Sequence, residues 1–297
     1  MSPMQGVIIK GVGGFYEVQA EGMLHTCRAR GKFRRDGLTP LPGDIVEFTP
    51  GNGEELGYVD KILPRRNALK RPAVANVDTL VLVTAAASPE PDLLLLDKLL
   101  IAARPMGMEL LLVINKCDLA APGAAEAIAG EYAGAVSSVI VMSAQSGLGR
   151  ERLLERLAGR CTCLAGQSGV GKTSILNCLF PDRAAMETGD VSRKTSRGRH
   201  TTRHAELLPV DGGGAVVDTP GFSLMEMDQM EPARLPECYP EFEPYAADCR
   251  FAGCMHDAEP GCAVKQAVAD GAIPSGRHNR YREILKEARE TWRNRYD

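Results

Sequence analysis

The sequence predicts a multidomain protein with an all-β barrel at the N-terminus, a central α/β domain with a mostly parallel sheet, and a small α-rich C-terminal domain. Three observations support this fold class. Short extended segments separated by turn residues fill residues 1–70, strands alternate with helices over residues 71–229, and cysteines gather within residues 230–297. A chain of 297 residues is also longer than one typical domain and suits two or three.

The composition is that of a soluble globular protein. Hydrophobic residues make up 44% of the chain and charged residues 25%, which are ordinary values for that class. The longest apolar run, residues 80–87, is far too short to span a bilayer. The nine cysteines are scattered over a long chain, and residues 1–10 lack the layout of an export signal. We therefore expect a cytoplasmic protein with no membrane partner, and a monomer, since nothing demands a dimer.

Residues 1–70 have the pattern of a small β-barrel. Residues 16–20 alternate between apolar and polar side chains, and residues 45–48 and 58–62 have a similar extended character. Glycine and proline residues separate these segments. A barrel of this size fits an OB-fold, although the pattern alone does not distinguish it from an SH3-like barrel.

One stretch of the predicted barrel is strongly basic. Arginines and lysines occupy five of the eight positions in residues 28–35, and Phe33 lies among them. On an OB barrel such a stretch can follow a phosphate backbone while an aromatic ring stacks on a base. Mildly basic barrels also occur without any nucleic-acid role, so RNA binding is one of two interpretations of this stretch.

From about residue 75 onward, strands alternate with helices. We expect strands at 77–87, 110–114, 136–142, 161–165, 205–210 and 215–217, and helices at 93–103, 123–133, 150–157 and 173–179. This alternation predicts a doubly wound α/β domain. Beyond residue 230 the chain is irregular until a charged helix from Arg280 to Arg293. So small and polar a segment predicts a modest core that a metal ion would help to fold.

The strongest single motif lies between a predicted strand and a predicted helix. Residues 166–173 match the phosphate-binding loop pattern, in which glycines let several backbone N–H groups point at phosphate oxygens. Lys172 would contact the β- and γ-phosphates, and the hydroxyl of Thr173 would ligate Mg²⁺. The expected nucleotide contacts of this segment are Gly166, Gln167, Ser168, Gly169, Val170, Gly171, Lys172, Thr173 and Ser174.

The motif that selects the base follows the predicted strand at 110–114. In the sequence Asn115-Lys116-Cys117-Asp118, the carboxylate of Asp118 can accept the N1–H and the exocyclic amino group of guanine. Adenine lacks that pair of donors. Lys116 would lie along the base, and Asn115 would tie this loop to the phosphate loop.

Two more motifs complete the predicted site for GTP and GDP. Ser143-Ala144 follows a strand and can offer a backbone N–H to guanine O6, and Asp218 offers a carboxylate for Mg²⁺. Gly221, three residues later, can offer a backbone N–H to the γ-phosphate. Any one of these motifs could be a simple turn, but four of them at the ends of predicted strands indicate a nucleotide site.

The order of these motifs is permuted. The guanine motifs at 115–118 and 143–147 precede the phosphate loop, whereas in Ras-like GTPases the phosphate loop comes first. A parallel sheet tolerates this change if the old termini are joined and a surface connection is cut. The segment after Gly221 then leads directly into the C-terminal domain, to which it could pass nucleotide-dependent movement.

A metal site is predicted in the C-terminal domain. Cys249, Cys254, His256 and Cys262 bring three thiols and one imidazole into a short segment, which is a common ligand set for a closed, tetrahedral zinc ion. The spacing is not the familiar pair of Cys-x2-Cys motifs, and cysteines that are merely buried and reduced are the alternative. Four ligands leave no open position, so we expect one structural zinc ion per chain.

The permuted motif order, the segments Gly198-Arg-His-Thr-Thr202 and Asp218-Thr-Pro-Gly-Phe222, and the cysteine-rich tail together resemble the ribosome small-subunit-dependent GTPase A family (RsgA, YjeQ type). The resemblance covers nearly the whole chain. It implies an OB-fold at 1–70, a circularly permuted P-loop GTPase domain at 71–229 and a zinc-binding domain at 230–297. It also implies a GTP hydrolase that acts in late assembly of the small ribosomal subunit and binds that subunit and its rRNA.

Two other functional classes stay open beside this one. A GTPase that delivers zinc or nickel would need an exchangeable metal site. An RNA-binding module with an inactive nucleotide site is the other, but the intact Lys172, Thr173, Asp118 and Asp218 argue against it.

The hydrolytic machinery departs from the common pattern. Many GTPases orient the attacking water with a glutamine at the position that Phe222 holds here, and a phenyl ring cannot do this. We therefore expect slow turnover that a partner accelerates. His200 is the candidate substitute, with a solvated loop histidine as an equal alternative. Thr201 or Thr202, with a slight preference for Thr202, would complete the Mg²⁺ shell.

Overall fold

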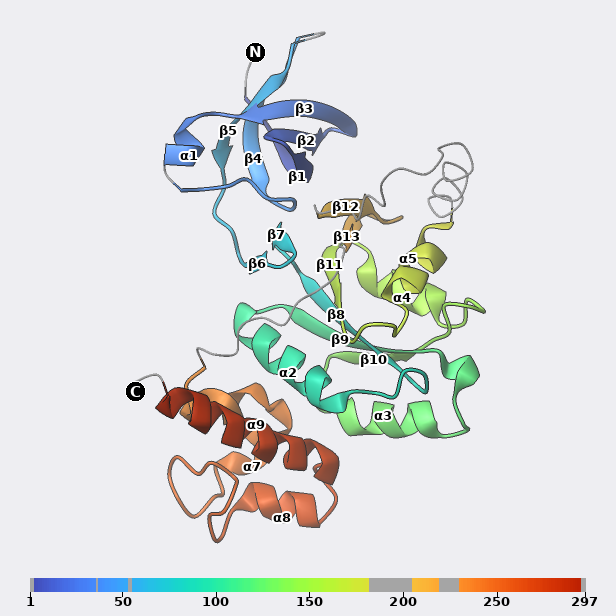
Figure 1. Ribbon diagram of the computed structural model, residues 1–297, viewed down its shortest axis with the longest axis vertical. Coiled ribbons are helices and arrows are strands. Elements are labelled where there is room, and N and C mark those ends of the chain that lie inside the picture. Colours follow the sequence, from blue (N-terminus) through green and yellow to red (C-terminus); the bar gives the residue numbers. More distant parts are fainter. Residues whose placement is uncertain (1–2, 36, 53–54, 182–204, 219–229, 295–297) are drawn as a thin grey trace. The chain divides into compact units, whose positions relative to one another are not determined.

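The computed structural model describes residues 3–35, 37–52, 55–181, 205–218 and 230–294 (Figure 1). Two compact units make up the chain. The first combines residues 1–80, 151–164 and 176–223, and the second combines residues 81–150, 165–175 and 224–297. Among the residues described, no helix is long and apolar enough to cross a membrane.

The first unit contains a closed five-stranded barrel, as the sequence predicted (Figure 1). Its strands are β1 (Met4–Val12), β2 (Phe15–Ala20), β3 (Met23–Ala29), β4 (Ile45–Thr49) and β5 (Gly57–Ile62). They pair in the order β1-β2-β3-β5-β4, and β4 closes the barrel by pairing antiparallel with β1. Parallel pairing of β3 with β5, among otherwise antiparallel neighbours, gives the OB-like arrangement.

Alternating side chains fill the interior of the barrel. On β2, Tyr16, Val18 and Ala20 are buried, and they pack with Phe48 of β4 and Val59 of β5. The period of two along each strand sends the intervening residues outward. The polar alternation seen in the sequence is thus the alternation between the core and the outer surface.

Phe33 corrects one expectation. It lies in the short helix α1 (Lys32–Arg35), between β3 and β4, and its side chain is only 5% exposed because it packs into the barrel core. The expectation that Phe33 stacks on a base is therefore wrong for this conformation. Spacing within a basic stretch did not indicate which way the ring faces.

Other strands of the first unit continue the β-sheet of the barrel. Here β11 (Arg160–Ala165) runs parallel to β13 (Gly214–Asp218), which pairs antiparallel with β12 (Glu206–Pro209). β12 meets the barrel strand β1 at the pair Lys10 and Glu206, whose side chains form a salt bridge of 3.0 Å. The unit also holds α4 (Arg150–Leu157) and the small hairpin of β6 (Ala68–Lys70) and β7 (Ala73–Ala75).

The second unit is built around a sheet of β8 (Thr79–Ala85), β9 (Glu109–Asn115) and β10 (Ser138–Val141). They lie in the order β10-β9-β8, and β9 and β10 are parallel. All seven residues of β8 are buried, as expected for a strand covered on both faces. Three helices accompany the sheet: α2 (Leu93–Ala103), α3 (Ala124–Tyr132) and α5 (Lys172–Leu179).

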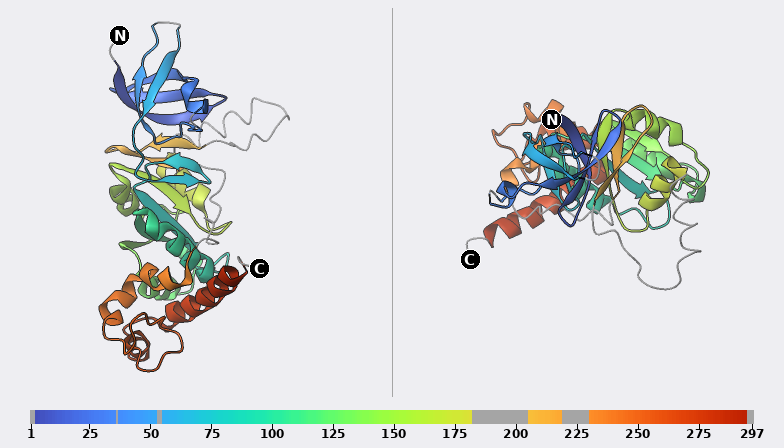
Figure 2. Two further views of the ribbon diagram at one scale, coloured as in Figure 1. Left: turned by 90° about the vertical axis from the view of Figure 1, so that its left-hand side faces the viewer. Right: turned by 90° about the horizontal axis from the view of Figure 1, so that it is seen from above.

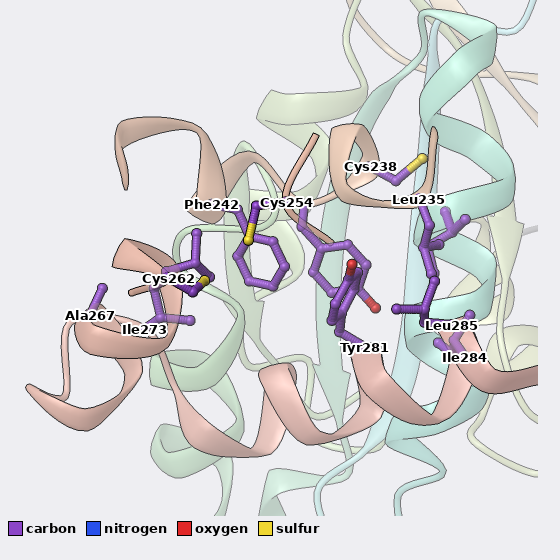
Figure 3. Packing of buried hydrophobic residues seen from close by; sticks show 13 residues of the cluster. Leu235, Cys238, Phe242, Cys254, Cys262, Ala267, Ile273, Tyr281, Ile284 and Leu285 are labelled. Atoms are coloured by element: carbon purple, nitrogen blue, oxygen red, sulfur yellow. The ribbon is translucent and has the colours of Figure 1, made fainter. Parts of the chain in front are cut away.

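The C-terminal part of the second unit is better packed than the sequence suggested (Figure 3). It contains α7 (Glu243–Ala246), α8 (Ala263–Ala269) and α9 (Ser275–Arg293), preceded by 3₁₀ turns at Pro232–Cys238 and Pro240–Phe242. The expectations of a modest core and of a final helix that begins at Arg280 are both wrong. The buried hydrophobic residues of this core are Leu235, Cys238, Tyr239, Phe242, Cys254, Cys262, Val264, Ala267, Ile273, Tyr281, Ile284 and Leu285, with Ile101 of α2.

The amphipathic face of α9 explains this core. Arg277, Ile284 and Leu285 each lie three or four residues from Tyr281, so the four share one face of the helix, and all four are buried. This face packs against α2 (Figure 1 and Figure 2). Apart from Arg277, most charged side chains of the helix are exposed.

Candidate functional site

The phosphate loop follows β11 and leads into α5. Its glycines are required by the backbone: Gly166 has a φ of +147° and Gly171 a φ of +98°, which L side chains rarely adopt. A Cβ on Gly166 would also collide with the carbonyl of Val83. The Nζ of Lys172, whose pKa is lowered by burial, donates to the carbonyl oxygens of Gly166 and Gln167, each at 2.8 Å. The lysine thus braces the loop from within.

Asn115 joins three of the predicted motifs. It is the last residue of β9, and its side chain is buried. Its Nδ2 donates to the carbonyl of Val170 in the phosphate loop at 2.9 Å, and its Oδ1 accepts from the N–H of Ala144 at 3.0 Å. Segments that are 29 and 55 residues away along the chain therefore meet at one amide.

Lys116 bridges the same loop to a segment that sequence analysis did not single out. Its Nζ donates to the carbonyl of Gly169 at 2.7 Å and to the carbonyl of Ser88 at 2.6 Å. Ser88 lies between β8 and α2 and carries no recognisable motif. Only the proximity of strand ends at one edge of a parallel sheet could have pointed to it.

The groups predicted to contact the base and Mg²⁺ are differently exposed. Asp118 lies in the 3₁₀ turn Cys117–Leu119 and is exposed, as are Thr173 and Ser174 in the first turn of α5. Ser143 is fully buried, and its Oγ accepts from the N–H of Ser146 at 3.2 Å. The loop that presents Ala144 is therefore fixed from inside.

Several residues of the predicted nucleotide site lie at the edge of the part of the chain that the structure describes, or outside it. Asp218 is the last residue of β13. The expectations for His200, Thr201, Thr202, Gly221 and Phe222 fall outside the described residues.

The four predicted metal ligands come together. The ligand atoms of Cys249, Cys254, His256 and Cys262 all lie within 4.8 Å of one another. Cys249 Sγ is 3.8 Å from Cys262 Sγ and 3.6 Å from His256 Nδ1, and Nδ1 is 3.4 Å from Cys262 Sγ. Bonds of about 2.3 Å to sulfur and 2.0 Å to nitrogen at tetrahedral angles give separations of about 3.8 Å between two sulfurs and about 3.5 Å between nitrogen and sulfur. The distances among Cys249, His256 and Cys262 are close to those of a tetrahedral zinc site.

Backbone groups and neighbouring side chains hold the metal cluster in shape. The N–H of Lys265 donates to Cys262 Sγ at 3.5 Å, which places the sulfur at the N-terminus of α8. His278 on α9 contacts the carbonyl of His256 through Nε2 at 2.8 Å, and Tyr281 OH donates to the carbonyl of Met255 at 2.5 Å. The ligand loop is therefore fastened to the final helix.

The barrel carries an exposed row of aromatic and arginine side chains that the sequence analysis missed. Phe15 on β2 pairs with Arg28 on β3, and Arg28 pairs with Tyr58 on β5, so the three lie side by side across three strands. The Arg28 guanidinium lies 4.6 Å from the centre of the Phe15 ring, and that of Arg30 lies 5.1 Å from the centre of the Tyr58 ring. Both rings are more than 40% exposed. The register of β3, which was not predicted, was needed to see this row.

The family follows from comparison with known proteins. The profile of the RsgA GTPase matches residues 62–228, which is more than half of the chain. The chain belongs to the RsgA GTPase family. The profile of the RsgA N-terminal domain of the same family matches residues 5–59.

Full-length relatives and solved structures agree with this assignment. "Small ribosomal subunit biogenesis GTPase RsgA" of Ruminiclostridium cellulolyticum is 47% identical, covering 95% of this chain and 92% of its own, and that of Shouchella clausii is 45% identical, covering 95% and 97%. YjeQ from Thermotoga maritima has a TM-score of 0.83 at 35% identity, covering 97% of this chain and 99% of its own. YloQ, described as a circularly permuted GTPase, has a TM-score of 0.81 at 34% identity, covering 97% and 96%. The predicted family and permuted architecture are confirmed.

Proposed function

We propose that this chain hydrolyses GTP while bound to the small ribosomal subunit during the late assembly of that subunit, and that the subunit stimulates hydrolysis. The observation that carries the nucleotide assignment is the double hydrogen bond of Asn115, which holds the phosphate loop and the Ser143-Ala144 loop beside Asp118. Membership of a GTPase family supports the reaction, and the names of the curated relatives support the partner.

The nucleotide assignments follow the chemistry of each group. Backbone N–H groups of residues 166–174 and the ammonium of Lys172 face the phosphates, and the carboxylate of Asp118 accepts from guanine. Oxygen donors suit Mg²⁺, so Thr173, Asp218 and Thr202 are the proposed ligands, with His200 as the proposed group that orients water. Mg²⁺ bound with GTP would supply charge neutralisation on the phosphates.

We assign the cysteine and histidine cluster to one structural zinc ion. Three of its four ligand residues, Cys254, His256 and Cys262, are buried, and their loop is fastened to α9. A closed four-ligand site in such surroundings stabilises a fold and does not release its metal readily. We retain residues 70 and 229 as the proposed limits between the barrel, the GTPase domain and the zinc-binding domain.

The rRNA contact is assigned to the barrel. The row of Phe15, Arg28 and Tyr58 on the outer face of β2, β3 and β5 offers two rings for base stacking and guanidinium groups for phosphates. We propose that the chain acts as a monomer.

Phosphate release from GTP tests the proposal. The purified protein is assayed alone, with isolated small subunits and with large subunits, and Lys172→Ala serves as the blank. We expect slow turnover alone and strong stimulation by small subunits only, with neither in the blank. Turnover that small subunits leave unchanged would remove the ribosomal partner, and turnover equal to the blank would remove the enzymatic assignment.

A further inference from the structure

A buried carboxylate lies at the junction between α2 and the C-terminal helix. Asp97 on α2 is fully buried, and it accepts hydrogen bonds from Arg277 Nη1, from Arg280 Nε at 2.7 Å and from Tyr132 OH at 2.6 Å. Arg277 and Arg280 lie on α9, and Arg277 is 180 residues from Asp97 along the chain. Tyr132 is the last residue of α3. One carboxylate therefore joins three helices.

Each charged group around Asp97 has at least one oppositely charged partner. Arg277 also binds Glu241 at 2.8 Å, and Arg280 also binds Glu131 at 2.7 Å. Arg277 is 1% exposed, and its guanidinium lies 4.5 Å from the centre of the Tyr239 ring. Buried ions are tolerated only when each is paired, and removal of one partner leaves an uncompensated charge. The position of α2 relative to α9 is therefore strongly determined.

The N-terminal end of α2 is reached from the candidate nucleotide site. The connecting residues 86–92 touch that site three times: Ala86 N–H donates to the carbonyl of Asn115 at 2.8 Å, Ser88 accepts from Lys116 at 2.6 Å, and Pro89 lies against Gly169 of the phosphate loop. Asp92 then caps α2 by accepting from the N–H of Leu95 at 2.9 Å. Residues 86–92 form a short segment that is hydrogen-bonded at both ends. A displacement of α2 must therefore move this segment.

We propose that Asp97 is a positioning residue for guanine-nucleotide binding. By fixing α2 against α9, it holds the carbonyl of Ser88 where it orients the ammonium of Lys116, and so the C-terminal domain contributes to nucleotide affinity. This inference rests on the proposed nucleotide site. It assigns to Arg277 and Arg280 a role that neither a phosphate-loop nor a zinc motif would reveal.

A purely structural role makes a different prediction. If Asp97 only stabilised the fold, its loss would lower the free energy of unfolding without changing nucleotide affinity at temperatures where the variant is fully folded. A positioning role changes the affinity under those same conditions. Coupling between two sites is typically worth 5- to 150-fold in affinity.

The test measures the dissociation constant of a fluorescent GDP analogue at 10 °C for the zinc-loaded full chain and for Asp97→Asn. The matched control is Glu287→Gln, which breaks the ion pair of 2.6 Å between Glu287 on α9 and Lys98 on α2 at a site where Glu287 is about half exposed. We expect Asp97→Asn to weaken binding by about 5- to 100-fold, and the control to change it by less than about twofold. The KM for GTP should rise with the dissociation constant while kcat stays unchanged.

Each outcome decides the inference. A folded, zinc-loaded Asp97→Asn protein that binds the analogue as tightly as the wild type would overturn it, as would an equal loss in Glu287→Gln. If Asp97→Asn does not fold, Arg280→Gln takes its place, since Arg277 still pairs with Asp97 in that variant, and unchanged affinity would again overturn the inference. Failure of the wild-type chain to bind the analogue would instead contradict the proposed function.

Discussion

Asn115 shows at the scale of one residue how a permuted chain assembles a nucleotide site. Its amide uses the nitrogen for Val170 and the oxygen for Ala144, so both halves are satisfied in a buried position. Neither bond depends on the order in which the segments occur along the chain. They depend on the ends of parallel strands meeting at one edge, which permutation preserves.

The isosteric substitution Asn115→Asp removes one of the two hydrogen bonds and keeps the other. The remaining oxygen can still accept from Ala144, but a second oxygen now faces the carbonyl oxygen of Val170 with no proton between them. Because an unpaired buried polar group costs about 1–3 kcal/mol, we expect GDP affinity to fall by about 5- to 150-fold. Equilibrium titration with the fluorescent analogue measures this loss. The exposed Asn52→Asp on the barrel is the matched control, and an equal affinity for the two variants would contradict the role of Asn115.

The outer row of the barrel makes a second prediction at this scale. Phe15→Ala and Tyr58→Ala should each weaken binding to isolated small subunits by about 1–3 kcal/mol, since each removes a stacking platform. Leu24→Ala is the control, because Leu24 is 60% exposed on the same barrel but has no aromatic ring. Co-sedimentation with small subunits gives the affinities. Equal binding by all three variants would show that the row does not contact rRNA.

At the scale of secondary structure, the sequence predicted the elements whose own pattern is strong. The helices at 93–103 and 150–157 have the predicted bounds. The strands of the α/β region begin and end within two residues of their predicted limits. β3 was missed because its more buried positions are occupied by His25, Cys27 and Ala29, which do not form an alternating run of large apolar residues in the sequence. α9 begins at Ser275 instead of Arg280 because the buried Arg277 and His278 look like surface residues in the sequence.

Zinc removal tests the C-terminal elements as a unit. Because Cys262 both belongs to the cluster and caps α8, loss of the metal should release α8 and the loop before it. We expect a strong chelator to lower the thermal unfolding temperature and to increase hydrogen exchange over residues 249–275.

A pair of variants supplies the control for that experiment. Cys262→Ala should contain almost no zinc, whereas Cys238→Ala, which alters a buried cysteine outside the cluster, should keep about one zinc ion per chain. Elemental analysis of the purified proteins measures the content. Equal zinc content in the two variants would contradict the assignment of the ligands.

At the scale of the whole molecule, the family and the order of its motifs could be predicted from the sequence, but the coupling between distant segments could not. The phosphate loop, the guanine motif and the four metal ligands are local patterns with fixed chemistry. The bond between Asp97 and Arg277 spans 180 residues and depends on how α2 and α9 pack. Similarly, the orientation of Phe33 depends on the barrel core and not on its neighbours in sequence.

The most direct test of the central claim exchanges the base that the enzyme accepts. In Asp118→Asn the side chain keeps an oxygen for N1–H but offers an amide N–H in place of the second acceptor, so it suits xanthine, which has a carbonyl where guanine has its amino group. Phosphate release is measured from GTP and from xanthosine triphosphate, with and without small subunits. We predict that the variant loses subunit-stimulated turnover of GTP and gains it with xanthosine triphosphate. A variant that still prefers GTP, or whose turnover of either nucleotide ignores the subunit, would contradict a guanine-specific site activated by the ribosome.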